Sequence, residues 1–205
     1  MKLYFTPGAC SLSPHIVLRE LGLRFDLVRV DPTTKQTADG HDFREINPHG
    51  YVPALVLDDG SVLTEGPAIV QYLADQVPAA GLAPANGTFA RYKLQEWLNF
   101  ISTEIHKTFS PLFKADTPEV VKESQKTKLA LRLDVVERTL GKQDYLLPSG
   151  FSVADVYMFT VLSWARFFHI GLDRWPGVSR FMQRVGERPV VKAAVEFETA
   201  SKKAA

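Results

Sequence analysis

Cys10 is the one cysteine in a chain of 205 residues, and it lies where a predicted strand leads into a predicted helix. Lys2–Phe5 has the pattern of a strand, Thr6–Ala9 that of a loop, and Ser13–Pro14 that of a helix start. Amide N–H groups at a helix start lack intrahelical partners. Together with the helix dipole they favour an anion, which lowers the pKa of a nearby thiol. The position therefore suggests sulfur chemistry, although a lone cysteine is also commonly a small buried apolar residue.

The residues around Cys10 show alternating strand and helix signals. After Lys2–Phe5, apolar residues at helical spacing predict a helix near Pro14–Leu21, and Phe25–Val30 alternates like a half-exposed strand. A strand–helix–strand unit of this length predicts a parallel pair of strands with a right-handed crossover. This unit carries the thiol at its first turn.

A hairpin and a further helix complete the first region of the chain. Asp58-Asp59-Gly60 is a strong turn signal between two short strands, Pro53–Leu57 and Ser61–Leu63. Gly66-Pro67 then opens another helix. The order strand–helix–strand, hairpin, helix predicts a thioredoxin-like α/β domain with a four-stranded mixed sheet over residues 1–78.

The remainder of the chain has only helical patterns. A stretch rich in proline, alanine and glycine, Val77–Gly87, has the composition of a linker. Ser152–Asp155 has the residues of a capping box and opens a segment that is apolar on nearly every side, which predicts a buried central helix. We expect an all-α domain over residues 88–205. Its predicted helices are Phe89–Thr108, Glu119–Leu140, Phe151–Phe168, Val178–Gly186 and Val190–Ala200.

Composition and charge exclude several classes of function. The 24 basic and 23 acidic residues give a net charge of +1, which leaves no excess basic charge for binding nucleic acid. The most apolar stretch, Val156–Ala165, is far shorter than the ~20 residues that a membrane span needs. One cysteine and the lack of a secretory pattern at the N-terminus predict a cytoplasmic protein. No histidine or acidic spacing predicts a metal site, and no glycine-rich phosphate loop is present.

Several motifs make the chain similar to the cytosolic glutathione S-transferases. The most specific are the run from Asn47 to Leu55 (NPHGYVPAL), the run from Leu63 to Ile69 (LTEGPAI) and the Ser152–Asp155 box. The run from Cys10 to Pro14 (CSLSP) and the pair His106-Lys107 resemble the bacterial beta class, in which a cysteine takes the place held by Tyr or Ser in other classes. The resemblance covers the chain from Met1 to about Ala200.

The resemblance implies roles for residues of the first domain. Val52-Pro53 matches a cis-proline corner at which the backbone of Val52 pairs with the cysteinyl backbone of glutathione. Glu65 takes the γ-glutamyl ammonium, and the N–H of Gly66 meets the γ-glutamyl carboxylate at a helix start. Gly66 stands where the family usually has Ser, so a hydroxyl contact to that carboxylate is missing. Lys35 matches the basic residue that reaches the glycyl carboxylate.

The resemblance also implies roles for residues of the helical domain, with glutathione as co-substrate and no metal. The positions that line the glutathione site, partly across a homodimer interface, are Asn99, Thr103, Glu104 and His106. Cys10 faces the glutathione sulfur and is able to form a mixed disulfide with it, and His106 helps to tune that sulfur. The implied activity is detoxification, through conjugation of glutathione to a small apolar electrophile.

Two other functions are compatible with these residues. The first is glutathione-dependent thiol–disulfide exchange with Cys10 as the attacking thiolate; because Ser13 rather than a second cysteine lies three positions on, external glutathione would have to resolve the mixed disulfide. The second is a non-catalytic protein that binds glutathione or an apolar ligand, since a fold by itself does not determine a function.

Overall fold

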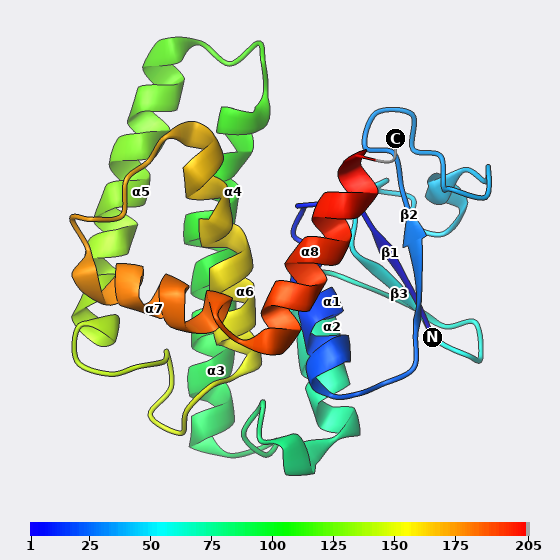
Figure 1. Cartoon of the computed structure of the whole chain (residues 1–205), viewed down its shortest axis with the longest axis horizontal. Coiled ribbons are helices and arrows are strands. Elements are labelled where there is room, and N and C mark those ends of the chain that lie inside the picture. Colours follow the sequence, from blue (N-terminus) through cyan, green and yellow to red (C-terminus); the bar gives the residue numbers. More distant parts are fainter. Residues whose placement is uncertain (204–205) are drawn as a thin grey trace. The chain divides into compact units, whose positions relative to one another are not determined.

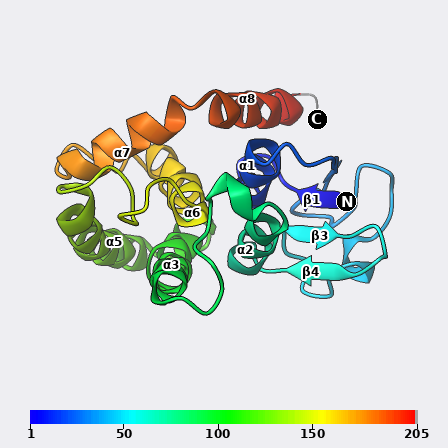
Figure 2. The same ribbon diagram turned by 90° about the horizontal axis from the view of Figure 1, so that it is seen from below.

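The computed structural model describes residues 1–203, and these form two compact units (Figure 1). The first unit contains Met1–Gly81 together with the chain from Arg188 onward, and the second contains Leu82–Glu187. This division differs from the expected domains, 1–78 and 88–205, in the placement of the last helix, α8 (Pro189–Lys203). The reason is that α8 packs against the first helix of the sheet unit (Figure 2).

The first unit is built on the predicted four-stranded mixed sheet, in the order β2-β1-β3-β4. The pair β1–β2 is parallel, as the strand–helix–strand pattern predicts, and the pairs β1–β3 and β3–β4 are antiparallel. The strands are β1 Lys2–Phe5, β2 Asp26–Arg29, β3 Ala54–Val56 and β4 Val62–Thr64.

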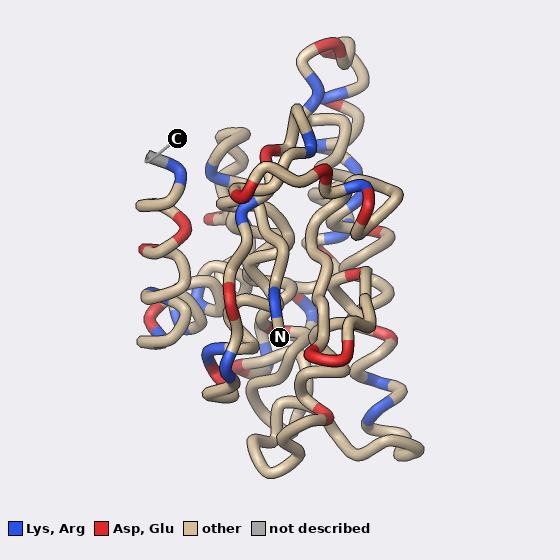
Figure 3. The backbone as a smooth tube through the Cα atoms, turned by 90° about the vertical axis from the view of Figure 1, so that its right-hand side faces the viewer, with Lys and Arg blue, Asp and Glu red and all other residues tan. Residues whose placement is uncertain are grey.

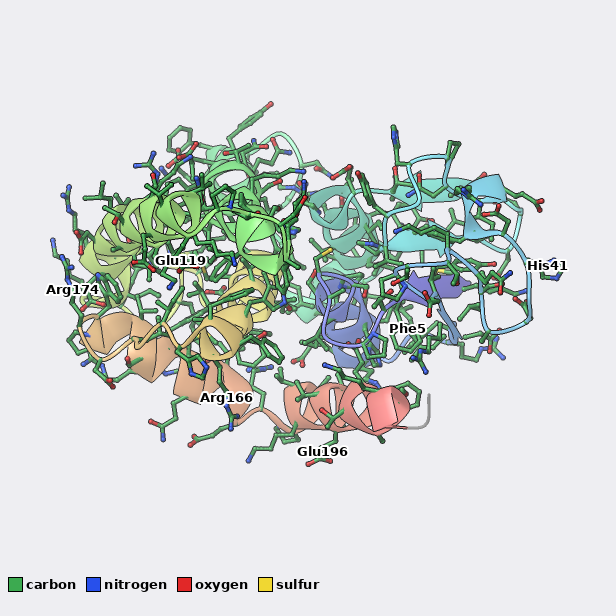
Figure 4. The ribbon with its side chains drawn as sticks, turned by 90° about the horizontal axis from the view of Figure 1, so that it is seen from above. Phe5, His41, Glu119, Arg166, Arg174 and Glu196 are labelled. Atoms are coloured by element: carbon green, nitrogen blue, oxygen red, sulfur yellow. The ribbon has the colours of Figure 1, made fainter. Side chains whose placement is uncertain are left out.

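Helices cover one face of this sheet and a loop covers the other, as the contacts of two neighbouring residues of β1 show. Phe5, labelled in Figure 4, lies with its ring centroid 6.4 Å from that of His15 in α1 (Leu12–Glu20). On the other face, Tyr4 contacts Phe43 of a short 3₁₀ helix in the long loop that follows β2 (ring centroids 5.4 Å). The alternation of a strand therefore sends Phe5 toward the helices and Tyr4 toward the loop. The second helix of the unit, α2 (Gly66–Gln76), packs beside α1.

The second unit is all helical, as predicted. Its first helix, α3 (Phe89–Phe100), continues into a π-helical segment, Ile101–His106, and a final turn, α4 (Lys107–Phe109). The others are α5 (Glu119–Leu140), α6 (Val153–Leu162) and α7 (Pro176–Gly186). Every residue of α6 is buried, which confirms the core of the predicted central helix. The helix is shorter than the predicted range Phe151–Phe168, because Ser163–Phe168 forms a 3₁₀ segment in which Phe167 is 60% exposed.

The start of α6 is held by the acid of the predicted capping box. The carboxylate of Asp155 accepts hydrogen bonds from the amide and hydroxyl of Ser152 (2.8 and 2.7 Å) and from the amide of Leu146 (2.8 Å). Burial raises the pKa of Asp155 to about 6, although these donors oppose the rise by stabilising the ionised carboxylate. The box therefore joins α6 to the loop before it.

The contact between α5 and α7 depends on a glycine. A Cβ at Gly177 would lie 2.5 Å from the backbone nitrogen of Gly141 and 2.6 Å from the carbonyl carbon of Leu140, so no larger residue fits without a backbone shift. Glu137 of α5 accepts hydrogen bonds from the amide of Gly177 (2.9 Å) and from that of Val178 (3.0 Å). The close approach thus lets one carboxylate cap the start of α7.

Basic and acidic residues are interspersed along the backbone of both units (Figure 3). Short-range pairs join neighbours on one helix, such as Lys93 with Glu96 and Lys126 with Glu123. Among residues 1–203, no helix combines the length and the apolar character needed to cross a bilayer.

Candidate functional site

Cys10 lies one residue before the N-cap of α1, which is Ser11. Its side chain is partly exposed, and its Sγ lies 3.3 Å from the carbonyl oxygen of Val52. A thiol can donate to that oxygen but a thiolate cannot, so this contact stabilises the protonated form. The corner predicted to hold the peptide backbone is therefore in direct contact with the cysteine.

The amides at the start of α1 were expected to be unpaired, but two of them have hydrogen-bond acceptors. Leu12 donates to the carbonyl of Ala9 (3.1 Å), and Ser13 donates to that of Cys10 (3.1 Å). A tight turn before the helix thus supplies acceptors for two of the amides expected to face the sulfur. A thiolate at Cys10 would rely on the helix dipole and on a bound ligand more than on these amides.

The three segments that the resemblance assigns to glutathione meet in the first unit. The Val52-Pro53 bond is cis, as predicted. Gly66 is the first residue of α2, and a Cβ there would lie 3.8 Å from Oγ of Ser13 and 3.9 Å from Cγ of Pro53. The start of α1, the proline corner and the start of α2 are therefore neighbours.

Two of the predicted binding residues have a left-handed backbone. Glu65 has φ of 66° and precedes α2, and its carbonyl accepts from the amides of Ala68 and Ile69 (3.0 Å each). Lys35 has φ of 62°, and its Nζ lies 5.9 Å from the ring centroid of Tyr51. Non-glycine residues rarely adopt this conformation, and they do so more often at functional sites. Lys35 is thus placed next to the loop that leads to the proline corner.

A buried hydrogen-bonded chain supports the loop before Cys10, and it was not predicted from the sequence. Arg19 donates through Nε to Nε2 of His15 (2.7 Å), and Nδ1 of His15 lies 2.9 Å from Oε1 of Glu198 in α8. The second oxygen, Oε2 of Glu198, accepts from the amide of Gly8 (2.8 Å). The spacing of His15 and Arg19 on one helix face was a usable signal, but nothing local pointed to Glu198.

In the second unit, three of the four predicted residues share the π-helical segment Ile101–His106. π-Helical turns are rare and are frequent at functional sites, yet no sequence pattern predicted this one. The hydroxyl of Thr103 donates to the carbonyl of Asn99 (3.0 Å). Glu104 accepts from Nε of Arg132 in α5 (2.6 Å), so its charge is balanced by a residue outside the predicted site.

His106 has two aromatic neighbours within the second unit. Its Nδ1 lies 2.7 Å from the hydroxyl of Tyr157 in α6, and its ring centroid lies 4.9 Å from that of Trp164 in a T-shaped contact. Burial, with a smaller effect of Lys107, lowers the pKa of His106 to about 4. The imidazole is therefore neutral near pH 7, with one nitrogen carrying a proton and the other a lone pair.

The described residues, 1–203, contain no group of three or more histidine, cysteine or acidic side chains that could hold a metal ion. In the first unit the thiol of Cys10 lies beside the cis Val52-Pro53 bond. Main-chain groups and side chains of both signs are the kinds of group that bind a small charged peptide.

Comparison with known proteins gives matches in both units. Residues 8–76 match the family model described as "Glutathione S-transferase, N-terminal domain", and residues 100–189 match "Glutathione S-transferase, C-terminal domain". The chain is 48% identical over 198 residues to the glutathione S-transferase GstA of Escherichia coli O157:H7, covering 97% of this chain and 98% of that protein.

Comparison with solved structures also gives glutathione S-transferases as matches. A ternary complex of BphK, a bacterial glutathione S-transferase, is 56% identical with a TM-score of 0.96, covering 97% of this chain and 100% of that one. A sphingomonad glutathione S-transferase complexed with glutathione is 43% identical with a TM-score of 0.94, covering 97% and 99%. A beta-class enzyme of Sphingomonas chungbukensis is 44% identical with a TM-score of 0.94, covering 97% and 98%.

Proposed function

Because this chain belongs to the glutathione S-transferase family and is a glutathione transferase, we propose that it conjugates glutathione to small apolar electrophiles with Cys10 facing the tripeptide's sulfur. The single observation that carries this proposal is the meeting of Cys10, the Val52-Pro53 corner and the start of α2. These elements come from three separate stretches of sequence, and each offers a group that the tripeptide needs.

Glutathione has charges at both ends and a peptide backbone between them. In our proposal the backbone of Val52 pairs with the cysteinyl residue as an added strand would. The amide of Gly66, at the start of α2, binds the γ-glutamyl carboxylate, and Glu65 binds the ammonium. Lys35 binds the glycyl carboxylate. The tripeptide then presents its sulfur toward Cys10, which lies 3.3 Å from the carbonyl of Val52.

The proposed reaction is an attack by the glutathione thiolate on an electrophilic carbon. The glutathione thiol first loses its proton to solvent or to a nearby base, and the thiolate then forms a carbon–sulfur bond. In a substitution the leaving group departs with the electron pair of the broken bond; in an addition the substrate carbanion takes up a proton. Cys10 and His106 act by stabilising the glutathione thiolate before the attack.

The second unit contributes the remaining proposed contacts. Asn99, Thr103, Glu104 and His106 line the glutathione site, in part from a second copy of the chain in a homodimer. The electrophile is held by apolar side chains of this unit. Phe113 is one of them, and it is accessible to a substrate because it is 53% exposed. Support for an apolar substrate comes from this exposed aromatic surface.

Binding of glutathione to the full chain tests the assigned site. Glu65→Ala removes the acid proposed to bind the ammonium, so we expect loss of retention on glutathione-agarose and a large rise in the Kd measured by titration calorimetry. Glu45→Ala is the matched control, because Glu45 is an exposed acid of the same unit outside the site. Undiminished binding by Glu65→Ala would refute the assignment of this residue and of the corner around it.

Thiol–disulfide exchange is the second candidate function, and the partly exposed thiol of Cys10 favours it. In this reaction the Cys10 thiolate attacks the glutathionyl sulfur of a mixed disulfide and releases the other thiolate. A second glutathione thiolate then attacks that sulfur, releases Cys10 and leaves glutathione disulfide. Exchange requires Cys10 to stay reduced and conjugation requires reduced glutathione, so we propose the cytoplasm as the location.

Replacing the cysteine separates the two functions. We expect Cys10→Ala to abolish disulfide reduction, because no other thiol exists in the sequence. Conjugation should persist in part, since the nucleophile there is the sulfur of glutathione. Disulfide reduction that survives Cys10→Ala would exclude exchange through this residue.

A further inference from the structure

The hydroxyl of Tyr157 is a polar group on a wholly buried helix, whose other polar side chains are those of Asp155 and Thr160. Tyr157 lies in α6, of which every residue is buried, and is itself only 2% exposed. Its hydroxyl lies 2.7 Å from Nδ1 of His106, which is the distance of a strong hydrogen bond. Tyr157 and His106 are 51 residues apart in the sequence, so only the packing of α6 against the π-helical segment brings them together.

The chemistry of the two groups decides which of them donates. A phenol is a stronger acid than a neutral imidazole N–H, and an imidazole nitrogen is a stronger base than a phenol oxygen. An O–H···N bond is therefore favoured over an N–H···O bond between the same atoms. In the first arrangement Nδ1 of His106 accepts, and the single proton of the neutral ring is on Nε2.

The surroundings also hold the ring of His106 in place. The ring of Trp164 contacts it at 4.9 Å between centroids, and Trp164 is itself only 4% exposed. The ring of Tyr157 makes a second T-shaped contact, at 5.9 Å. A 180° flip of the imidazole would put Cδ2 in the place of Nδ1, so it would break the bond to Tyr157.

We propose that Tyr157 is a positioning residue that donates its hydroxyl proton to Nδ1 of His106 and holds the imidazole in the tautomer with its proton on Nε2. His106 then acts on the glutathione sulfur as a hydrogen-bond donor and not as a base. This inference rests on the proposed function, because that function places His106 beside glutathione. It identifies Tyr157 as the residue that sets which nitrogen of His106 is protonated. It also assigns His106 the role of hydrogen-bond donor to the glutathione sulfur.

Nitrogen NMR of the histidine side chains, measured on the full chain with and without glutathione, reads the tautomer directly. We expect the signal of His106, assigned with His106→Gln, to show a protonated Nε2 at pH 7. Tyr157→Phe keeps the ring and removes the hydroxyl, so the signal should shift toward a mixture of tautomers. Tyr145→Phe is the matched control, because Tyr145 contacts Phe151 and not His106.

Kinetics provide the second measurement. Loss of one buried hydrogen bond predicts a fall in kcat/KM of about five- to tenfold for Tyr157→Phe and no change for Tyr145→Phe. His106→Gln retains an N–H donor and should keep more activity than His106→Glu, which offers only an acceptor near neutral pH. A protonated Nδ1 in the native chain, or an unchanged tautomer in Tyr157→Phe, would overturn the positioning role.

His106→Ala separates this inference from the proposed function. If this variant binds glutathione and transfers it at the native rate, His106 lies outside the site, and both the assignment and the inference fail. If it loses activity while Tyr157→Phe keeps the native tautomer and rate, the site assignment stands and only the role of Tyr157 fails.

Discussion

Glu198 accepts a hydrogen bond from the amide of Gly8 (2.8 Å), although 190 residues separate the two in the sequence. The same carboxylate lies 2.9 Å from Nδ1 of His15. Gly8 belongs to the loop that ends at Cys10, so the last helix helps to set the position of the cysteine. Glu198 is 2% exposed and His15 is fully buried, which makes any loss of this contact costly.

We expect Glu198→Ala to destabilise the protein. The change removes the buried carboxylate that accepts from the amide of Gly8 and contacts Nδ1 of His15, at a cost of about 2–4 kcal/mol in the free energy of unfolding measured with urea. Glu196→Ala, at an exposed position of the same helix, should stay within about 0.5 kcal/mol of the native value. The rate of Cys10 alkylation should change in the first variant and not in the second; equal alkylation rates in both would show that Glu198 does not position the loop.

Restoring a hydroxyl at Gly66 should tighten glutathione binding. The backbone there is not left-handed, and a Cβ would meet only ordinary contacts at 3.8 and 3.9 Å, so Gly66→Ser fits. A hydrogen bond to a carboxylate is worth about 1.5 kcal/mol, which corresponds to a roughly tenfold lower Kd for glutathione. Gly66→Ala adds the Cβ without the hydroxyl, and equal affinity in the two variants would show that the hydroxyl does not reach the carboxylate.

A methyl group at Gly177 should weaken the second unit. The Cβ of Gly177→Ala would lie 2.5–2.7 Å from backbone atoms of Leu140 and Gly141, and backbone cannot move aside as a flexible side chain can. We expect a loss of about 2–4 kcal/mol in the free energy of unfolding, measured by urea denaturation. Gly171→Ala, whose nearest neighbour is a carboxylate oxygen of Asp173 at 3.6 Å, is the control and should be nearly neutral.

His106 should make the free energy of unfolding depend on pH. Its pKa is about 4 in the folded protein and 6.5 in the unfolded chain, so between these values the unfolded chain binds more protons. The contribution of His106 is therefore complete above pH 6.5 and is lost as the pH falls toward 4, by up to about 3 kcal/mol.

Comparison with His106→Gln isolates this contribution from those of other groups, such as Asp155. Urea denaturation at pH 7.5 and at pH 4.5 should show a smaller difference between the two pH values in the variant than in the native chain. An identical difference in both proteins would contradict the lowered pKa of His106.

The prediction of the first unit succeeded where the signals were local. The alternation of Lys2–Phe5, the turn Asp58-Asp59-Gly60 and the helix start at Gly66-Pro67 each depend on residues only a few positions apart. The cis bond at Val52-Pro53 was predicted from the motif that contains it. The amides at the start of α1 were mispredicted, because the turn that pairs them is set by the backbone of Ala9 and Cys10.

The sequence by itself determined the family and the order of strands and helices, and it supplied the residues that we propose for the glutathione site. Only the tertiary structure decided that α8 belongs with the sheet unit, that Arg132 pairs with Glu104, and that Tyr157 meets His106. Local patterns depend on neighbouring residues, whereas these two pairs join residues 28 and 51 positions apart, and the bond from Gly8 to Glu198 of α8 spans 190 positions. Such contacts arise when buried faces pack, and packing brings together polar groups that no short stretch of sequence specifies.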